Sequence, residues 1–157
     1  MRTLSLLLIP LFISGGIALA RVAAPGLQAH QGFEGVAQQQ SVSLDPGSLD
    51  FGNQVVGRRS KAKRITVKNT GVKPLYVGSV TGEGDNWSDF AIVTDTCTGA
   101  TVAPNKACII DVTFAPSHTD ERNASLKLND DAYDSPQAVS LKGNGINSAD
   151  APPFAAR

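Results

Sequence analysis

Residues 97–114, CTGATVAPNKACIIDVTF, decide the fold, because the stretch ends in four apolar side chains at every second position. Cys108, Ile110, Val112 and Phe114 would project from one side of an extended strand, with the intervening residues on the other side. The same alternation recurs between residues 41 and 145, at Ile65 and Val67, Leu75 and Val77, Phe90 and Ile92, Ala124, Leu126 and Leu128, and Val139 and Leu141. Seven or eight short strands separated by turns, with no window of helical period, predict an antiparallel β-sandwich.

The only two cysteines, Cys97 and Cys108, have ten residues between them, which raises the alternatives of a metal site, a redox pair and a disulfide. A Cys-x-x-Cys redox spacing is absent. A tetrahedral zinc site needs four ligands, and the two histidines, His30 and His118, lie far apart in unrelated contexts. Outside the cytoplasm, two cysteines this close tend to be oxidised together. We therefore predict a Cys97–Cys108 disulfide, with no metal and no cofactor.

The N-terminus is typical of an export signal. Arg2 precedes the apolar run LSLLLIPLFISGGIALA, residues 4–20, which ends in a small-x-small pattern. Because Pro10 and two glycines interrupt the run, a cleaved signal peptide over residues 1–20, cut after Ala20, is favoured over an uncleaved anchor. We expect a secreted or periplasmic protein with no stable membrane insertion after cleavage.

The rest of the chain divides into three segments. Residues 21–40 are broken by proline and glycine and predict a flexible lead-in, with a strand donated to a partner through Phe33 and Val36 as the alternative. Residues 41–145 form the single domain. Residues 146–157 are polar and proline-bearing, and we expect a disordered tail.

Charge is unevenly placed along a chain whose formal net charge is zero. Residues 51–82 carry seven Lys or Arg and no acid, whereas residues 83–157 carry eleven acids against five bases. The candidate binding residues are the basic stretch Arg58, Arg59, Lys61, Lys63 and Arg64. The stretch suits an acidic protein, a glycan or an anionic ligand, or else is a solvated face, and the bipolar charge also allows head-to-tail self-association. Without interleaved aromatic residues, nucleic acid is not expected.

Two further sequence features, a tryptophan and a group of aspartates, each allow a functional and a structural interpretation. Trp87, in the polar stretch EGDNWSDF, is either an exposed contact residue or a cap on the end of the core. Asn129, Asp130, Asp131 and Asp134 gather oxygen ligands of the kind that calcium prefers, but the EF-hand spacing is absent. We therefore predict a polar turn between the last two strands.

Several motifs together resemble the bacterial choice-of-anchor D repeats, relatives of the ASPM/SPD-2/Hydin (ASH) domains in the PapD-like immunoglobulin superfamily. They are LDFGNQVVG (49–57), VKNTG (67–71), SDF (88–90), the cysteine hairpin with VTFAP (112–116), and SPQAVSLKGNG (135–145). The resemblance implies an immunoglobulin-like sandwich in which Gly52 and Gly57 flank the bend where the first strand crosses between sheets. It also implies that Gly71 and Gly143 end strands at positive φ, and that Pro116 stops the strand before it.

The resemblance implies a binding or assembly module. No nucleophile elbow, HExxH motif or glycine-rich phosphate loop is present, so we do not expect an enzyme. The leading hypothesis is a structural or adhesive component of a bacterial envelope or surface assembly that acts through a protein partner. The alternatives are a periplasmic PapD-like chaperone, and a glycan or anionic-ligand binder.

Overall fold

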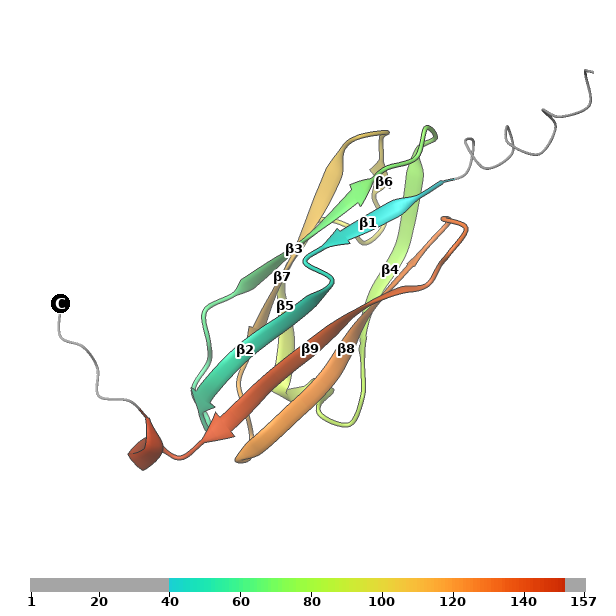
Figure 1. Cartoon of the computed structure of the whole chain (residues 1–157). Coiled ribbons are helices and arrows are strands. Elements are labelled where there is room, and N and C mark those ends of the chain that lie inside the picture. Colours follow the sequence, from blue (N-terminus) through green and yellow to red (C-terminus); the bar gives the residue numbers. More distant parts are fainter. Residues whose placement is uncertain (1–39, 152–157) are drawn as a thin grey trace, which may run out of the picture. The chain divides into compact units, whose positions relative to one another are not determined.

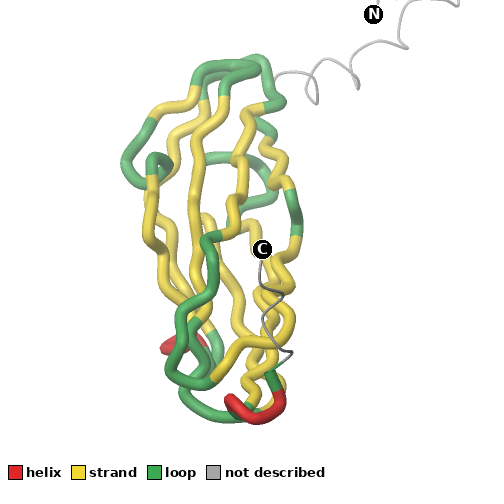
Figure 2. The backbone as a smooth tube through the Cα atoms, turned by 90° about the vertical axis from the view of Figure 1, so that its left-hand side faces the viewer, coloured by secondary structure: helices red, strands yellow, loops and turns green. Residues whose placement is uncertain are grey.

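The computed structural model describes residues 40–151, whose strands form two sheets packed as a sandwich (Figure 1). One sheet has the order β1 (Val42–Asp45), β3 (Lys63–Asn69), β7 (Ala107–Phe114), β5 (Phe90–Asp95). The other has the order β2 (Ser48–Val55), β9 (Gln137–Ile146), β8 (Asp120–Asp130), β4 (Leu75–Glu83), β6 (Thr101–Val102). Two short 3₁₀ turns, η1 (Trp87–Asp89) and η2 (Ser148–Asp150), lie among the loops (Figure 2). The predicted all-β immunoglobulin-like sandwich is confirmed.

The expected signal peptide, residues 1–20, lies outside the described residues, as do most of the lead-in and residues 152–157. β9 ends at Ile146 and η2 follows it, so the start of the segment expected to be a disordered tail has defined secondary structure. No helix in the described part of the chain is long and apolar enough to cross a membrane.

The core follows the alternation seen in the sequence. Ile110, Val112 and Phe114 of β7 are all at most 1% exposed, and they face buried residues of β8 and β9 in the other sheet. Phe114 stacks on Phe90 with ring centroids 4.8 Å apart. Each such large apolar side chain contributes about 1.5–3 kcal/mol on burial, so these inward rows hold the two sheets together.

The first strand passes from one sheet to the other at Pro46-Gly47, between β1 and β2. The expectation that Gly52 and Gly57 flank this crossing is wrong. Gly52, at φ +65°, lies where the register of β2 against β9 shifts, and Gly57, at φ +73°, lies in the turn after β2.

β2 pairs with β9 in parallel, whereas the other pairings among the described strands are antiparallel. The predicted antiparallel sandwich is confirmed as a fold class, and this one parallel pair is an exception to it. After the crossing, β2 lies beside β9, the last strand of the domain, and runs in the same direction.

Gly143 lies in the middle of β9 rather than at a strand end, and neither it nor Gly71 is among the positive-φ glycines of the described residues. A Cβ atom at Gly143 would come within 2.4 Å of the Phe114 ring. The glycine is needed because the ring occupies the space of a side chain. Pro116 has the expected effect, since β7 ends at Phe114.

The disulfide between Cys97 and Cys108 is confirmed. Cys97 follows the end of β5, and Cys108 is the second residue of β7, so the bond ties an edge strand to its neighbour. Both residues are buried. The bond encloses a loop that contains the two-residue strand β6.

The sheet edges are short or interrupted. β1 has four residues and β6 has two. Register shifts interrupt β2 between Asp50 and Asn53, β4 beyond Val77, and β5 beyond Ile92. Short and bulged edges discourage the addition of a further strand.

Candidate binding surface

Residues 56–62 connect β2 to β3 and carry the first part of the basic stretch; we call them the basic loop. The backbone N–H of Gly57 donates to the Pro116 carbonyl over 2.9 Å, and that of Ser60 donates to the Phe114 carbonyl over 2.8 Å. The Ser60 hydroxyl in turn accepts the N–H of Phe114 at 3.0 Å. The basic loop is therefore held to the end of β7, while Arg58, Arg59 and Lys61 remain exposed.

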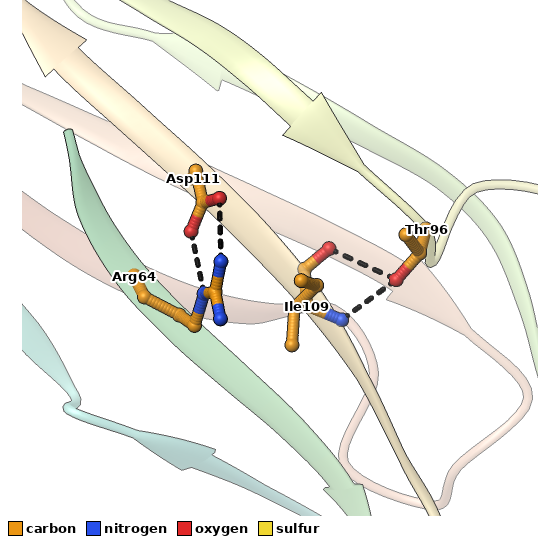
Figure 3. A network of polar contacts seen from close by, with 4 residues as sticks. All are labelled: Arg64, Thr96, Ile109 and Asp111. Carbon is orange, nitrogen blue, oxygen red and sulfur yellow. Dashed lines mark hydrogen bonds and ion pairs between the residues drawn. The ribbon is translucent and has the colours of Figure 1, made fainter.

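The last two members of the basic stretch are engaged within the domain. Arg64 on β3 stands opposite Asp111 on β7, and its guanidinium donates to both carboxylate oxygens, at 2.8 and 2.9 Å (Figure 3). The hydrogen bonds from Arg64 lower the pKa of the Asp111 carboxyl. Lys63 donates to the Asp50 carbonyl, and its amino group lies 5.6 Å from the centre of the Phe51 ring.

Two hydrogen bonds next to this ion pair hold the chain after β5 against β7. The Thr96 hydroxyl accepts the N–H of Ile109 at 2.9 Å and donates to the Ile109 carbonyl at 3.2 Å, which attaches the chain after β5 to β7 (Figure 3). Arg64 is therefore bonded within the sheet, whereas Arg58, Arg59 and Lys61 lie on the basic loop.

Arg58, Arg59 and Lys61 take part in none of the ion pairs formed among residues 40–151. Three cations on β8 and β9, namely Arg122, Lys127 and Lys142, are each paired with an acid. Lys63 and Lys68 on β3 take part in none of these ion pairs. The basic loop therefore presents three exposed cations that have no ion-pair partner in the described residues, on a backbone that is tied to β7.

A hollow of about 480 Å³ lies beside this loop. Its lining combines apolar and polar groups, from Gln54, Val55, Arg58, Ser148 and Ala151. The end of β2, the basic loop and the chain after β9 therefore meet there. The sequence did not indicate this hollow, because its lining comes from segments far apart in the chain.

Trp87 occupies the core-capping position that was one of its two alternatives. Its ring is partly buried and covers Gly82 on β4, where a Cβ atom would lie 1.9 Å from ring atoms. Asp89, two residues later, is buried and accepts from Arg122 Nε at 2.6 Å and from the Ser117 N–H at 3.1 Å. This turn therefore closes one end of the sandwich, and a binding role for Trp87 stays a prediction.

The aspartate-rich segment forms the predicted polar turn between β8 and β9. In the described part of the chain, no group of three or more His, Cys, Asp or Glu is placed to hold a metal ion. The turn presents Tyr133, which is 81% exposed. The sequence analysis missed Tyr133, although the aspartates that flank it in DDAYD indicated an exposed position.

Comparison with known proteins identifies the domain. A family model described as "HYDIN/CFA65/VesB-like, Ig-like domain" matches residues 40–144. The chain belongs to this family. The sequence resemblance to ASH domains is thereby confirmed.

Solved structures share the fold of this HYDIN/CFA65/VesB-like domain at low identity. The secreted serine protease VesC from Vibrio cholerae matches with a TM-score of 0.54 and 19% identity, over 76% of this chain and 25% of VesC. The ASH/PapD-like domain 7 of human CEP192 matches with a TM-score of 0.52 and 12% identity, over 70% of this chain and 88% of that domain. The periplasmic chaperone SfaE matches with a TM-score of 0.51 and 15% identity, over 68% of this chain and 59% of SfaE. The chain thus spans a quarter of VesC and less than two thirds of SfaE. No curated protein sequence matches it.

The VKNTG motif of this HYDIN/CFA65/VesB-like domain has a structural role around Asn69, which is fully buried. The Asn69 amide donates to the carbonyls of Lys73 and Val102 at 2.7 and 2.8 Å, and its oxygen accepts the Gly71 N–H at 2.9 Å. One side chain therefore joins the β3–β4 turn to β6, at the opposite end of β3 from the basic loop.

Proposed function

We propose that this domain is an exported, non-enzymatic binding module that acts through protein–protein contacts, as a structural or adhesive component of a bacterial envelope or surface assembly. The observation that carries the proposal is the basic loop: three exposed cations without an internal ion pair in the described residues, on a backbone tied to β7. A loop whose backbone is already fixed loses less conformational entropy on binding than a mobile loop, which favours recognition. Export is supported by the disulfide, which is typical of oxidising compartments.

The short or register-shifted edge strands favour binding of a partner through side chains over binding by addition of a strand to a sheet. Recognition by added strands needs a continuous row of free backbone groups. The edges here are four residues or shorter, or shifted in register. The periplasmic-chaperone alternative, which the shared fold of SfaE raises, would need such an edge.

Cross-linking followed by affinity capture of the tagged protein from its native cell envelope tests the proposal. We expect one partner in fixed ratio with the wild type, and its loss from the double variant Arg58→Glu/Arg59→Glu. The matched control is Lys68→Glu/Lys73→Glu, which makes the same change of charge at exposed lysines outside the basic loop and should retain the partner.

Three results contradict the proposal. Capture of nothing removes a protein-binding role. Capture that is equal for both double variants removes the basic loop as the contact. Recovery of many unrelated, partly unfolded exported proteins indicates a chaperone, which stoichiometric suppression of client aggregation would then establish.

A further inference from the structure

The end of the sandwich away from the basic loop carries a charged surface of the opposite sign. Residues 131–134, which we call the acidic tip, form the turn between β8 and β9. Asp131 and Asp134 are exposed and form no ion pair with any residue of the described segment. Tyr133 stands between them and is 81% exposed. Tyrosine is among the residues that most often dominate the binding energy of protein interfaces.

The acidic tip is held in place by the fold. The Asp131 carboxylate accepts the Tyr76 N–H at 2.9 Å, and the Asp134 carboxylate accepts from the Gln137 amide at 2.9 Å. Ala132, buried beneath the turn, donates its N–H to Asp130 at 2.8 Å. Each of the two exposed acids uses one oxygen in these bonds, so the other oxygen and the charge remain available to a partner.

The basic loop supplies the complementary surface. Arg58, Arg59 and Lys61 match the negative charge of Asp131 and Asp134. The hollow beside Arg58 combines apolar lining from Val55 and Ala151 with polar groups from Gln54 and Ser148. Its lining suits a tyrosine, which has an apolar ring and a hydroxyl at its end, and the Arg58 guanidinium at its rim can stack on such a ring.

The two surfaces cannot meet within one molecule. The basic loop follows the end of β2 at Val55, which pairs with Ile146 at the end of β9, whereas the acidic tip precedes the start of β9. They are separated by the ten residues of β9, or roughly 30 Å at about 3.3 Å per residue. Figure 1 shows the two turns at opposite ends of the sandwich.

We propose that the acidic tip of one copy docks into the basic loop of a second copy, with Tyr133 in the hollow beside Arg58 and the two aspartates against Arg58, Arg59 and Lys61. Because the surfaces differ and lie at opposite ends, the contact is head-to-tail and extends into open chains of subunits. This inference rests on the proposed protein-binding function and names its partner as the same chain.

Sedimentation velocity of the full chain, produced by export through an oxidising compartment, tests the contact. At about 0.02 M salt we expect a ladder of oligomers that grows with protein concentration, and at about 0.5 M salt we expect dissociation, because exposed charges are then screened. Tyr133→Ala should weaken association about tenfold or more. Val93→Ala, which truncates another exposed apolar side chain on β5, outside both surfaces, is the control and should not.

A mixing experiment tests the polarity. The loop variant Arg58→Ala/Arg59→Ala keeps an intact tip, and the tip variant Asp131→Asn/Tyr133→Ala/Asp134→Asn keeps an intact loop. The asparagines preserve the acceptors for Tyr76 and Gln137. Each variant alone should be monomeric, and an equal mixture should stop at one-to-one pairs, since the remaining surfaces no longer match.

The inference is overturned if the wild type is monomeric at low salt, if Tyr133→Ala associates as the wild type does, or if the mixed variants do not pair. A monomeric wild type that still captures an envelope protein through Arg58 and Arg59 overturns self-association and leaves the proposed function in place. A monomer that captures nothing overturns both.

Discussion

Replacement of Asn69 by alanine should be among the most destabilising single changes in the domain, although it removes no apolar group. The side chain is fully buried and makes three hydrogen bonds of 2.7–2.9 Å. The buried bond to the Val102 carbonyl would be lost, at a cost of about 1–3 kcal/mol. The Lys73 carbonyl can reach water, and the Gly71 N–H keeps a bond to Ser41, so each of these losses costs about 0.5–1.5 kcal/mol. We expect about 4 kcal/mol in all, a large share of a typical domain stability of about 5–15 kcal/mol.

Equilibrium unfolding in urea, with the disulfide intact, measures this effect through the fluorescence of Trp87, the single tryptophan of the chain. The control is Asn144→Ala, which removes an exposed amide with one bond of 3.0 Å, to Asn53, and should cost about 0.5 kcal/mol or less. A loss below about 1 kcal/mol at Asn69, with an unchanged dependence on denaturant, would refute the reasoning. So would equal losses at Asn69 and Asn144.

Three further predictions use the same unfolding assay. Gly143→Ala should cost about 1–3 kcal/mol, because its Cβ would lie 2.4 Å from the Phe114 ring, and an unchanged midpoint would contradict that contact. Reduction of the Cys97–Cys108 disulfide should cost about 2–3 kcal/mol, and a double alanine variant insensitive to reductant is the control. Burial alone would raise the pKa of Asp89, but hydrogen bonds from Ser117 and Arg122 together lower it below its ordinary value. Its contribution to stability is therefore present above about pH 4 and lost as the pH falls through the folded pKa. Asp89→Asn should flatten the acid side of the stability profile, and a profile parallel to the wild type would contradict the assignment.

The sequence predicted the fold class because the determinants of an all-β core are local. Alternation at Ile110, Val112 and Phe114 gives the buried face of a strand without knowledge of its neighbours. The disulfide was also predictable, since the chain holds only two cysteines. The parallel pairing of β2 with β9 was not, because it joins segments roughly 90 residues apart and depends on where the first strand changes sheets.

The sequence indicated that certain glycines are structurally required, but the reason it suggested for Gly143 was wrong. Gly143 was expected at a strand end, but what requires it is the Phe114 ring from a strand of the other sheet. The basic stretch shows the same limit. Arg64 differs from Arg58 only in that β3 places it opposite Asp111, 47 residues away in the chain. Contacts across the fold therefore determine which of these cations are engaged within the domain.

The parallel neighbours β2 and β9 also determine how the domain would respond to a pulling force. A pull on the chain before β1 draws β2 towards its own start, and a pull on the chain after β9 draws β9 towards its own end. Because the two strands are parallel and adjacent, they would slide along each other, and the hydrogen bonds between them would share the tension instead of opening one at a time. The register runs from Ser48–Ser140 to Val55–Ile146, so nearly the whole length of β2 would resist at once. With this geometry, the domain would remain folded under a tension that unzips a hairpin.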